Sequence, residues 1–130
     1  MSMQTRYSQE DDIVLIATSE RGEGSCDVEG HYWTAVVLPF GGGYKPVALE
    51  IMFVSDLMPL GANEGYSADT DALLIGQGKR AATLVEENHD LAAYWCADDD
   101  PDDLNLVAVS LRNASKHLAP VIAASAPRHE

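Results

Sequence analysis

The chain has 130 residues, the length of one domain, and 46 % of them are hydrophobic, which is enough to build a core. Eight Lys and Arg residues stand against 21 Asp and Glu residues, so the formal net charge at pH 7 is −13. Such a charge repels nucleic acids and anionic membranes and favours a basic protein partner or simple solubility. We therefore expect neither direct nucleic-acid binding nor membrane association.

No apolar run approaches the roughly 20 residues of a membrane-spanning helix, and the first residues do not resemble a secretory leader. The two cysteines, Cys26 and Cys96, lie far apart and have no further cysteines with which to form a framework. We therefore expect a cytoplasmic protein with reduced thiols. A disulfide between the two stays open if the fold brings them together.

The first half of the chain has the pattern of strands. Residues 1–12 are polar and are expected to be frayed, and residues 19–30 carry three glycines and mixed charge and are expected to form a loop. Three apolar segments rich in β-branched residues are predicted to be strands: residues 13–18, 31–38 and 44–54. The glycines between the last two segments favour a reversal, so these strands should form an antiparallel meander.

The second half has apolar residues at helical spacing. They recur at steps of three and four over residues 67–95, with Ser67 as a suitable N-cap and a break expected at the glycines in the middle. A further helix is predicted over residues 100–118, with Pro101 at its first position. Residues 106–111 also alternate, so a fourth strand is the competing prediction for that segment.

These patterns predict an α+β fold, with a small antiparallel β-meander followed by two or three C-terminal helices. Residues 1–130 are expected to form a single domain with frayed ends at about 1–11 and 120–130. No internal repeat is recognised in the sequence.

An acidic run at residues 98–103 is the obvious candidate for a metal site. Asp98, Asp100 and Asp102 stand at the first, third and fifth positions of a calcium-loop pattern. The sixth position is Asp103 instead of glycine, and the twelfth is valine instead of glutamate. We therefore predict a solvated, helix-capping run that holds no metal but can present an acidic surface to a partner.

The sequence offers no catalytic constellation. The histidines have no His or Cys partner at zinc-ligand spacing, and the serines sit in no nucleophile elbow. The glycines at 41–43 are not followed by the Lys and Ser or Thr of a phosphate loop. We therefore predict a protein that is not an enzyme and that needs no cofactor.

Three stretches together resemble the signature of the ArdB/KlcA-type antirestriction proteins. Residues 30–33 are similar to that family's strand entry, residues 41–44 to its hairpin, and residues 63–69 to a Glu-Gly element followed by Ser-Ala-Asp. The order and approximate spacing agree over roughly residues 27–84. The chain departs from the pattern at His31, where the family has glycine, and in a Glu-Gly to Ser-Ala-Asp spacing that is one residue shorter.

The resemblance implies a small α+β protein of phages, plasmids or integrated elements that inhibits a bacterial defence system, above all type I restriction, by protein–protein contact. One alternative is an anti-CRISPR protein whose acidic surface blocks a nucleic-acid channel. The other alternative is a non-catalytic small binding domain of unknown partner. The expected partner is a basic defence nuclease or effector subunit, and the oligomeric state stays open. The residues expected to bind this partner are Trp33, Tyr44, Asp69, Glu86, Glu87, Asp90, Asp98, Asp99, Asp100, Asp102 and Asp103.

Overall fold

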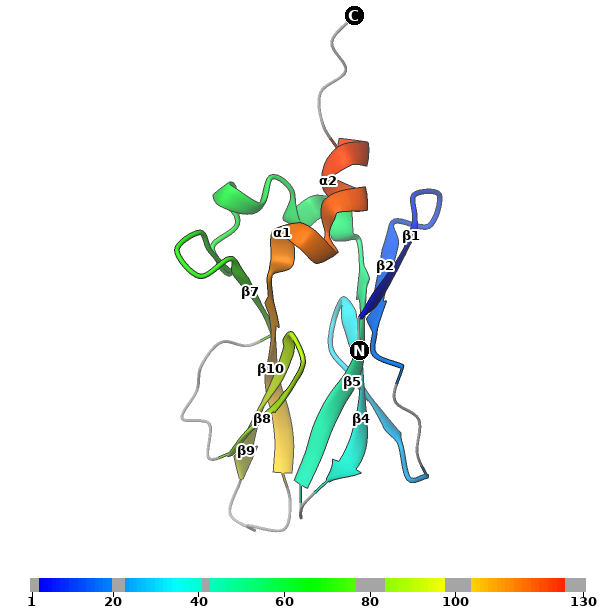
Figure 1. Cartoon of the computed structure of the whole chain (residues 1–130), viewed down its shortest axis with the longest axis vertical. Helices are drawn as coiled ribbons and strands as arrows, with labels where there is room; N and C mark the ends of the chain where they lie inside the picture. Colours follow the sequence, from blue (N-terminus) through cyan, green and yellow to red (C-terminus); the bar gives the residue numbers. More distant parts are fainter. Residues whose placement is uncertain (1–2, 20–22, 41–42, 77–83, 98–103, 126–130) are drawn as a thin grey trace, which may run out of the picture.

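Two five-stranded antiparallel sheets make up most of the residues that the structure describes, and they pack face to face (Figure 1). The computed structural model describes residues 3–19, 23–40, 43–76, 84–97 and 104–125. The short helical segments within these ranges gather at one end of the two sheets (Figure 1). None of the described helices is long and apolar enough to cross a membrane.

The first sheet comes from the N-terminal half of the chain. Its strands are β1 (Gln4–Ser8), β2 (Ile13–Ala17), β3 (Cys26–Glu29), β4 (Trp33–Phe40) and β5 (Gly43–Met52). Their order across the sheet is β1-β2-β5-β4-β3, and all neighbours are antiparallel. Two 3-10 helices, η1 (Val54–Leu57) and η2 (Leu60–Ala62), then lead out of this sheet.

The second sheet comes from the C-terminal half. Its strands are β6 (Tyr66–Ser67), β7 (Ala72–Gly76), β8 (Leu84–Asn88), β9 (Leu91–Ala97) and β10 (Leu104–Arg112). Their order is β6-β7-β10-β9-β8, again with antiparallel neighbours. The helices α1 (Ala114–His117) and α2 (Ala119–Ser125) follow β10 directly.

The core fills the space between the sheets, because alternate residues of each strand point inward. In β2, Val14 and Ile16 are fully buried, whereas Ile13 and Leu15 on the opposite face are only half-buried. Burial of each such side chain stabilises the fold by about 1.5–3 kcal/mol. One continuous cluster joins both sheets, and its larger members on the strands are Val14, Ile16, Trp33, Leu49, Ile51, Leu73, Ile75, Leu91, Val109 and Leu111.

The predicted antiparallel sheet is confirmed, but the described residues are mainly β with two short C-terminal helices, and the fold is not α+β. The helix predicted over residues 67–95 is wrong, because β6 to β9 occupy the described part of that segment. His89, with a positive φ of 54°, turns the chain between β8 and β9, and a helix cannot contain such a turn. The competing prediction of a strand over residues 106–111 is confirmed by β10, so the helix predicted there is also wrong.

Two further strands form where the sequence predicted none. β1 lies in the segment expected to be frayed and pairs with β2 over its full length, from Gln4 opposite Ala17 to Ser8 opposite Ile13. β3 lies in the segment expected to be a loop and pairs with β4. Both are edge strands with mostly polar side chains, and their backbone hydrogen bonds to a neighbour stabilise them without an apolar pattern.

The two sheets are two copies of one folding unit. In each copy a hairpin is followed by three antiparallel strands, the last of which returns to pair with the second strand of the hairpin. A β-bulge interrupts the pairing of the last two strands at the same place, between Val36 and Val37 in the first copy and between Leu106 and Ala108 in the second. The strand registers therefore assign counterparts to the residues that are paired in both copies.

Several counterparts are identical residues. Tyr7 faces Val14 in the first hairpin as Tyr66 faces Leu73 in the second, and the serine that follows each tyrosine also matches. The intervals between counterparts change along the chain, and most pairs share only the size or polarity of the side chain. That variation explains why no repeat was recognised from the sequence alone.

A pair of hydrogen bonds recurs in both copies and fixes the exit of the last strand. The carboxylate of Asp12 accepts hydrogen bonds from the amide of Ser55, at 3.0 Å, and from its hydroxyl. The carboxylate of Asp71 accepts the same two bonds from Ser115, at 3.1 and 2.6 Å. We call these two arrangements the Asp–Ser clamps. Each clamp ties the chain that leaves the central strand to the start of its neighbour.

Candidate functional site

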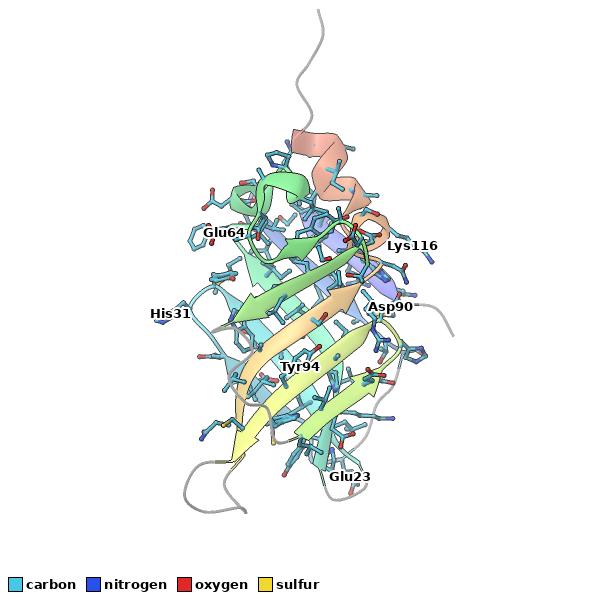
Figure 2. The ribbon with its side chains drawn as sticks, turned by 90° about the vertical axis from the view of Figure 1, so that its left-hand side faces the viewer. Glu23, His31, Glu64, Asp90, Tyr94 and Lys116 are labelled. Carbon is cyan, nitrogen blue, oxygen red and sulfur yellow. The ribbon has the colours of Figure 1, made fainter. Side chains whose placement is uncertain are left out.

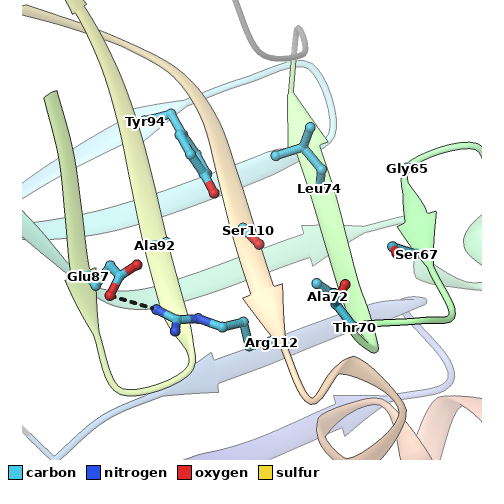
Figure 3. Close-up of a pocket in the computed structure, with 10 residues that line it drawn as sticks. All are labelled: Gly65, Ser67, Thr70, Ala72, Leu74, Glu87, Ala92, Tyr94, Ser110 and Arg112. Carbon is cyan, nitrogen blue, oxygen red and sulfur yellow. Dashed lines mark ion pairs between the residues drawn. The ribbon is translucent and has the colours of Figure 1, made fainter. Parts of the chain in front are cut away.

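The outer face of the second sheet is hollowed, and this hollow is the best candidate for a functional site (Figure 3). Its volume is about 480 Å³. Strands β6, β7, β10, β9 and β8 and the turn after β6 all contribute to it. The residues that line it are Gly65, Ser67, Thr70, Ala72, Leu74, Glu87, Ala92, Tyr94, Ser110 and Arg112.

Comparison of the two copies explains why the hollow lies on this sheet. Ala72 is the counterpart of Ile13, and Ala92 is the counterpart of Thr34. Ser110 is likewise the counterpart of Glu50. The same backbone therefore carries three larger side chains on the first sheet and three small ones on the second. The small side chains form the floor of the hollow.

Polar and aromatic groups surround this floor. Figure 3 shows the ring of Tyr94 along one wall, with its hydroxyl directed toward Ser110 and Arg112. An ion pair closes one side, because Nη2 of Arg112 lies 3.2 Å from Oε2 of Glu87. Both side chains stay accessible, with exposed fractions of 43 % and 63 %. The hollow can thus contact an apolar stem, a flat group and a hydrogen-bonding head at the same time.

A hydrogen-bond network centred on Asp71 holds the turn between β6 and β7, which borders the hollow. The hydroxyl of Tyr66 donates to Oδ1 of Asp71 at 2.6 Å, in addition to the bonds from Ser115. The bonds from Ser115 and Tyr66 stabilise the carboxylate and lower the pKa of Asp71. The same bond to Asp71 raises the pKa of Tyr66. Because Asp12 and Ser55 make the same clamp in the other copy, this network is structural.

A second network holds α1 to the turn between β8 and β9. Oδ2 of Asp90 lies 2.6 Å from Nε2 of the buried His117, and Asn113 donates to Oδ1 of Asp90 at 3.1 Å. Burial alone would raise the pKa of Asp90, but the bonds from His117 and Asn113 prevail and lower it. Within the described residues no histidine bonds a serine that lines the hollow, so the geometry provides no nucleophile and base pair.

The structure separates the residues that the sequence suggested as contacts. Trp33 is only 6 % exposed and belongs to the core. Tyr44 is 37 % exposed, and its ring lies 6.0 Å from that of Trp95, away from the hollow. Asp69 is exposed in the turn that carries Ser67 and Thr70.

The acidic candidates also differ in position. Glu87 lines the hollow (Figure 2 shows the strands of this face), and Asp90 lies in the following turn, where its carbonyl accepts a hydrogen bond of 2.7 Å from the amide of Arg112. Glu86 points to the opposite face of β8 and is half-buried. The acidic run Asp98, Asp99, Asp100, Asp102 and Asp103 lies outside the described residues. Of the predicted contacts, Asp69, Glu87 and Asp90 are therefore the ones that gather around one site.

Sequence reasoning missed Tyr94, Ser110 and Arg112, because it assigned them to helices. In a helix these three residues would not share a face, whereas in antiparallel strands β9 and β10 they do. In β10 the small Ser110 stands between the larger inward residues Val109 and Leu111, and this alternation is a signal that points to a strand with a shallow outer face. Among the described residues no group of three or more His, Cys, Asp or Glu could hold a metal ion. Cys26 and Cys96 are not joined by a disulfide.

Comparisons with protein-family models, with curated proteins and with solved structures find no match to this chain. The candidate site therefore stands on its own geometry.

Proposed function

We propose that this chain is a non-catalytic protein-binding domain that inhibits a bacterial defence system by binding a basic nuclease or effector subunit. One observation carries the proposal, which is the excess of acidic side chains on the surface that the structure describes. The exposed basic residues there are Arg6 and Lys116. The exposed acidic residues are Glu10, Asp11, Glu23, Asp27, Glu29, Asp56, Glu64, Asp69 and Glu87.

This charge distribution suits a partner that normally binds nucleic acid. Proteins that grip DNA or RNA do so with Lys and Arg, and an acidic protein surface is attracted to the same residues. Long-range attraction raises the association rate, while specificity needs local contacts. The hollow on the second sheet supports the proposal because it offers such local contacts beside Glu87.

Type I restriction is the first target class, because residues 30–33, 41–44 and 63–69 resemble antirestriction proteins. A CRISPR effector is the second, because its nucleic-acid channel is also basic.

The test is the plating efficiency of an unmodified phage on cells with a type I restriction system, with and without this gene. Parallel strains carry a type I CRISPR system and a matching spacer. Rescue of plaques on the restriction host supports the antirestriction target, and rescue on the CRISPR host alone supports the second target. No rescue on either host contradicts inhibition of both systems.

A matched pair of variants makes the test specific for the candidate site. Glu87 and Glu29 occupy the same position in the two copies, and both are exposed. We expect E87Q to reduce rescue and E29Q to leave it unchanged, although both remove one negative charge. Equal loss in both variants would mean that only the total charge matters.

A further inference from the structure

The floor of the hollow contains a serine hydroxyl that no described residue bonds. Ser110 is only 7 % exposed, and its hydroxyl makes no hydrogen bond to the described residues. The hydroxyl oxygen itself is not fully buried, so it is open to the hollow, where water or an entering group can bond it. Because Ser110 lines the hollow, a group that enters from outside can provide the missing partner.

The charges around the hollow favour a cation as that group. Glu87 uses Oε2 to bind Arg112, while its side chain is 63 % exposed and its other oxygen can accept a second donor. Asp69 lies exposed in the turn beside Ser67 and Thr70, and the whole chain carries a net charge of −13. Among the described residues that line the hollow, Arg112 is the one cationic side chain, and it is already paired with Glu87.

The shape and the remaining chemistry favour a guanidinium over an ammonium. The ring of Tyr94 forms a flat wall on which a planar cation can stack, and Ala72 and Ala92 leave room for an aliphatic stem. The hydroxyls of Ser67, Thr70 and Ser110 can each accept a hydrogen bond, which suits the five donors of an arginine better than the point charge of a lysine.

We propose that this hollow binds an arginine side chain of the partner protein, stacked on Tyr94 and bonded to Ser110 and Glu87. The inference rests on the proposed function in one respect, since the arginine is taken to come from the basic partner. The affinity of the hollow for the side chain itself can be measured without that partner.

The first experiment is an NMR titration of the full chain with N-acetyl-arginine-N-methylamide. We expect saturable shifts of the amide signals of Ala92, Tyr94 and Ser110. The uncharged citrulline derivative should give no saturable shift, and the lysine derivative should bind more weakly. Equal shifts with citrulline, stronger binding of a glutamate derivative, or no saturable shift at all would each overturn the proposal.

Two variants with opposite expected effects test whether the hollow binds a cation or an anion. E87Q should weaken binding of the arginine derivative about fivefold, because it removes the paired carboxylate. R112M introduces the residue of the counterpart Met52 and should strengthen binding, because Glu87 loses its internal partner. The reverse pattern would identify an anion site. E29Q on the first sheet is the control and should change nothing.

A third variant tests the hollow itself. A72I places in the floor the residue that its counterpart Ile13 already provides on the same backbone of the first sheet, so we expect the variant to fold. It should abolish binding of the arginine derivative while the unfolding midpoint stays close to that of the wild type. Unchanged binding in a folded A72I protein would exclude the hollow as the site.

The NMR titration tests the arginine site and the plating test the proposed function, so failure of one can be distinguished from failure of the other. Binding of the arginine derivative without rescue of phage on either host would leave the site intact and contradict the defence targets. Rescue of phage by a wild-type protein that binds no arginine derivative would contradict the site and leave the function standing on another surface.

Discussion

Phe53 occupies a backbone conformation that suits other residues better. Its φ is 53°, in the left-handed region, and its side chain is 61 % exposed. The other described non-glycine residues with positive φ are Asp12, Asp71, His89 and Asn113, which are the types that tolerate this region. Asn113 is the counterpart of Phe53 in the second copy, also with φ 53°.

We therefore predict that F53N stabilises the protein, by about 1 kcal/mol, because asparagine removes backbone strain and little apolar burial is lost. The reverse change, N113F, should destabilise it, since it adds strain and removes the hydrogen bond from Asn113 to Asp90. Urea unfolding of both variants at neutral pH measures the two effects. A loss of stability in F53N would show that the ring makes contacts that outweigh the strain.

The lowered pKa of Asp71 predicts an acid-sensitive contribution to stability. In the unfolded chain this carboxyl titrates near its usual pKa of 3.8, whereas in the folded chain its pKa is lower. The unfolded state therefore takes up protons first as the pH falls. The stabilisation is complete above the usual pKa and is lost as the pH drops through the folded value.

The comparison of wild type with D71N measures this contribution. The wild type should be the more stable of the two at pH 7, and the difference in urea midpoint should shrink as the pH falls below about 4. A difference that stayed constant down to pH 2.5 would mean that the clamp does not depend on the charge of Asp71.

At the scale of elements, the two Asp–Ser clamps should contribute equally to stability. S55A and S115A each remove the hydroxyl donor and leave the backbone bond to the same carboxylate. Each variant should lose about 1–2 kcal/mol, because the lost bond is made to a charged acceptor. Thermal unfolding of the two single variants and the double variant measures this. A near-zero cost in one copy would show that its clamp is incidental to the fold.

The sequence predicted the elements whose apolar pattern and turn chemistry agree. β2, β4 and β5 are rich in β-branched residues and are separated by glycines, and all three were predicted as strands. For β7 to β9 the pattern is ambiguous, because a hairpin that places Leu84, Leu91 and Trp95 inward also spaces them at steps of seven and four residues, which suit one face of a helix. The segment forms strands and not a helix because it pairs with β10, and such pairing cannot be read from a single segment of sequence.

The candidate site was predictable only in part for the same reason. Glu87 was singled out for its charge alone. Ser110 and Ala92 carry no chemical signal in the sequence, and their meaning comes from neighbours on other strands and from the larger counterparts Glu50 and Thr34. A hollow made by small side chains on a sheet is a property of the assembled face, so it appears only once the register is known.

At the scale of the whole molecule, the two copies should unfold together. They are separate sheets, yet one core cluster contains Val14 and Ile51 from the first and Leu73 and Leu111 from the second. Exposure of one sheet would therefore expose the core face of the other. A folding unit of about 60 residues buries only about 60 % of the surface of its unfolded chain, so each copy alone would be marginally stable.

Two single-tryptophan variants test this cooperativity, since Trp33 lies on the first sheet and Trp95 on the second. In W95F the fluorescence of Trp33, and in W33F that of Trp95, should follow the loss of secondary structure measured by circular dichroism in the same variant. Two separate transitions in either variant would mean that the sheets are independent units.

The net charge of −13 predicts a strong salt dependence for association with a basic partner. We expect the affinity for a purified type I restriction complex to fall about tenfold between roughly 50 and 300 mM salt, mainly through the association rate. Surface plasmon resonance measures the association and dissociation rates separately. An affinity that did not change with salt would contradict attraction by the acidic surface.

Gly30 and Trp33 are linked by a steric constraint that can be recognised when sequences are compared. A Cβ on residue 30 would lie 2.2 Å from the indole of Trp33, which is buried in the core. Any larger residue at position 30 must therefore displace a core side chain, and replacement of Trp33 removes the reason for the glycine. The two positions should vary jointly across related chains. A shared Gly-x-x-Trp thus reports how a strand enters a core, and two proteins can have it in common while they bind unrelated targets.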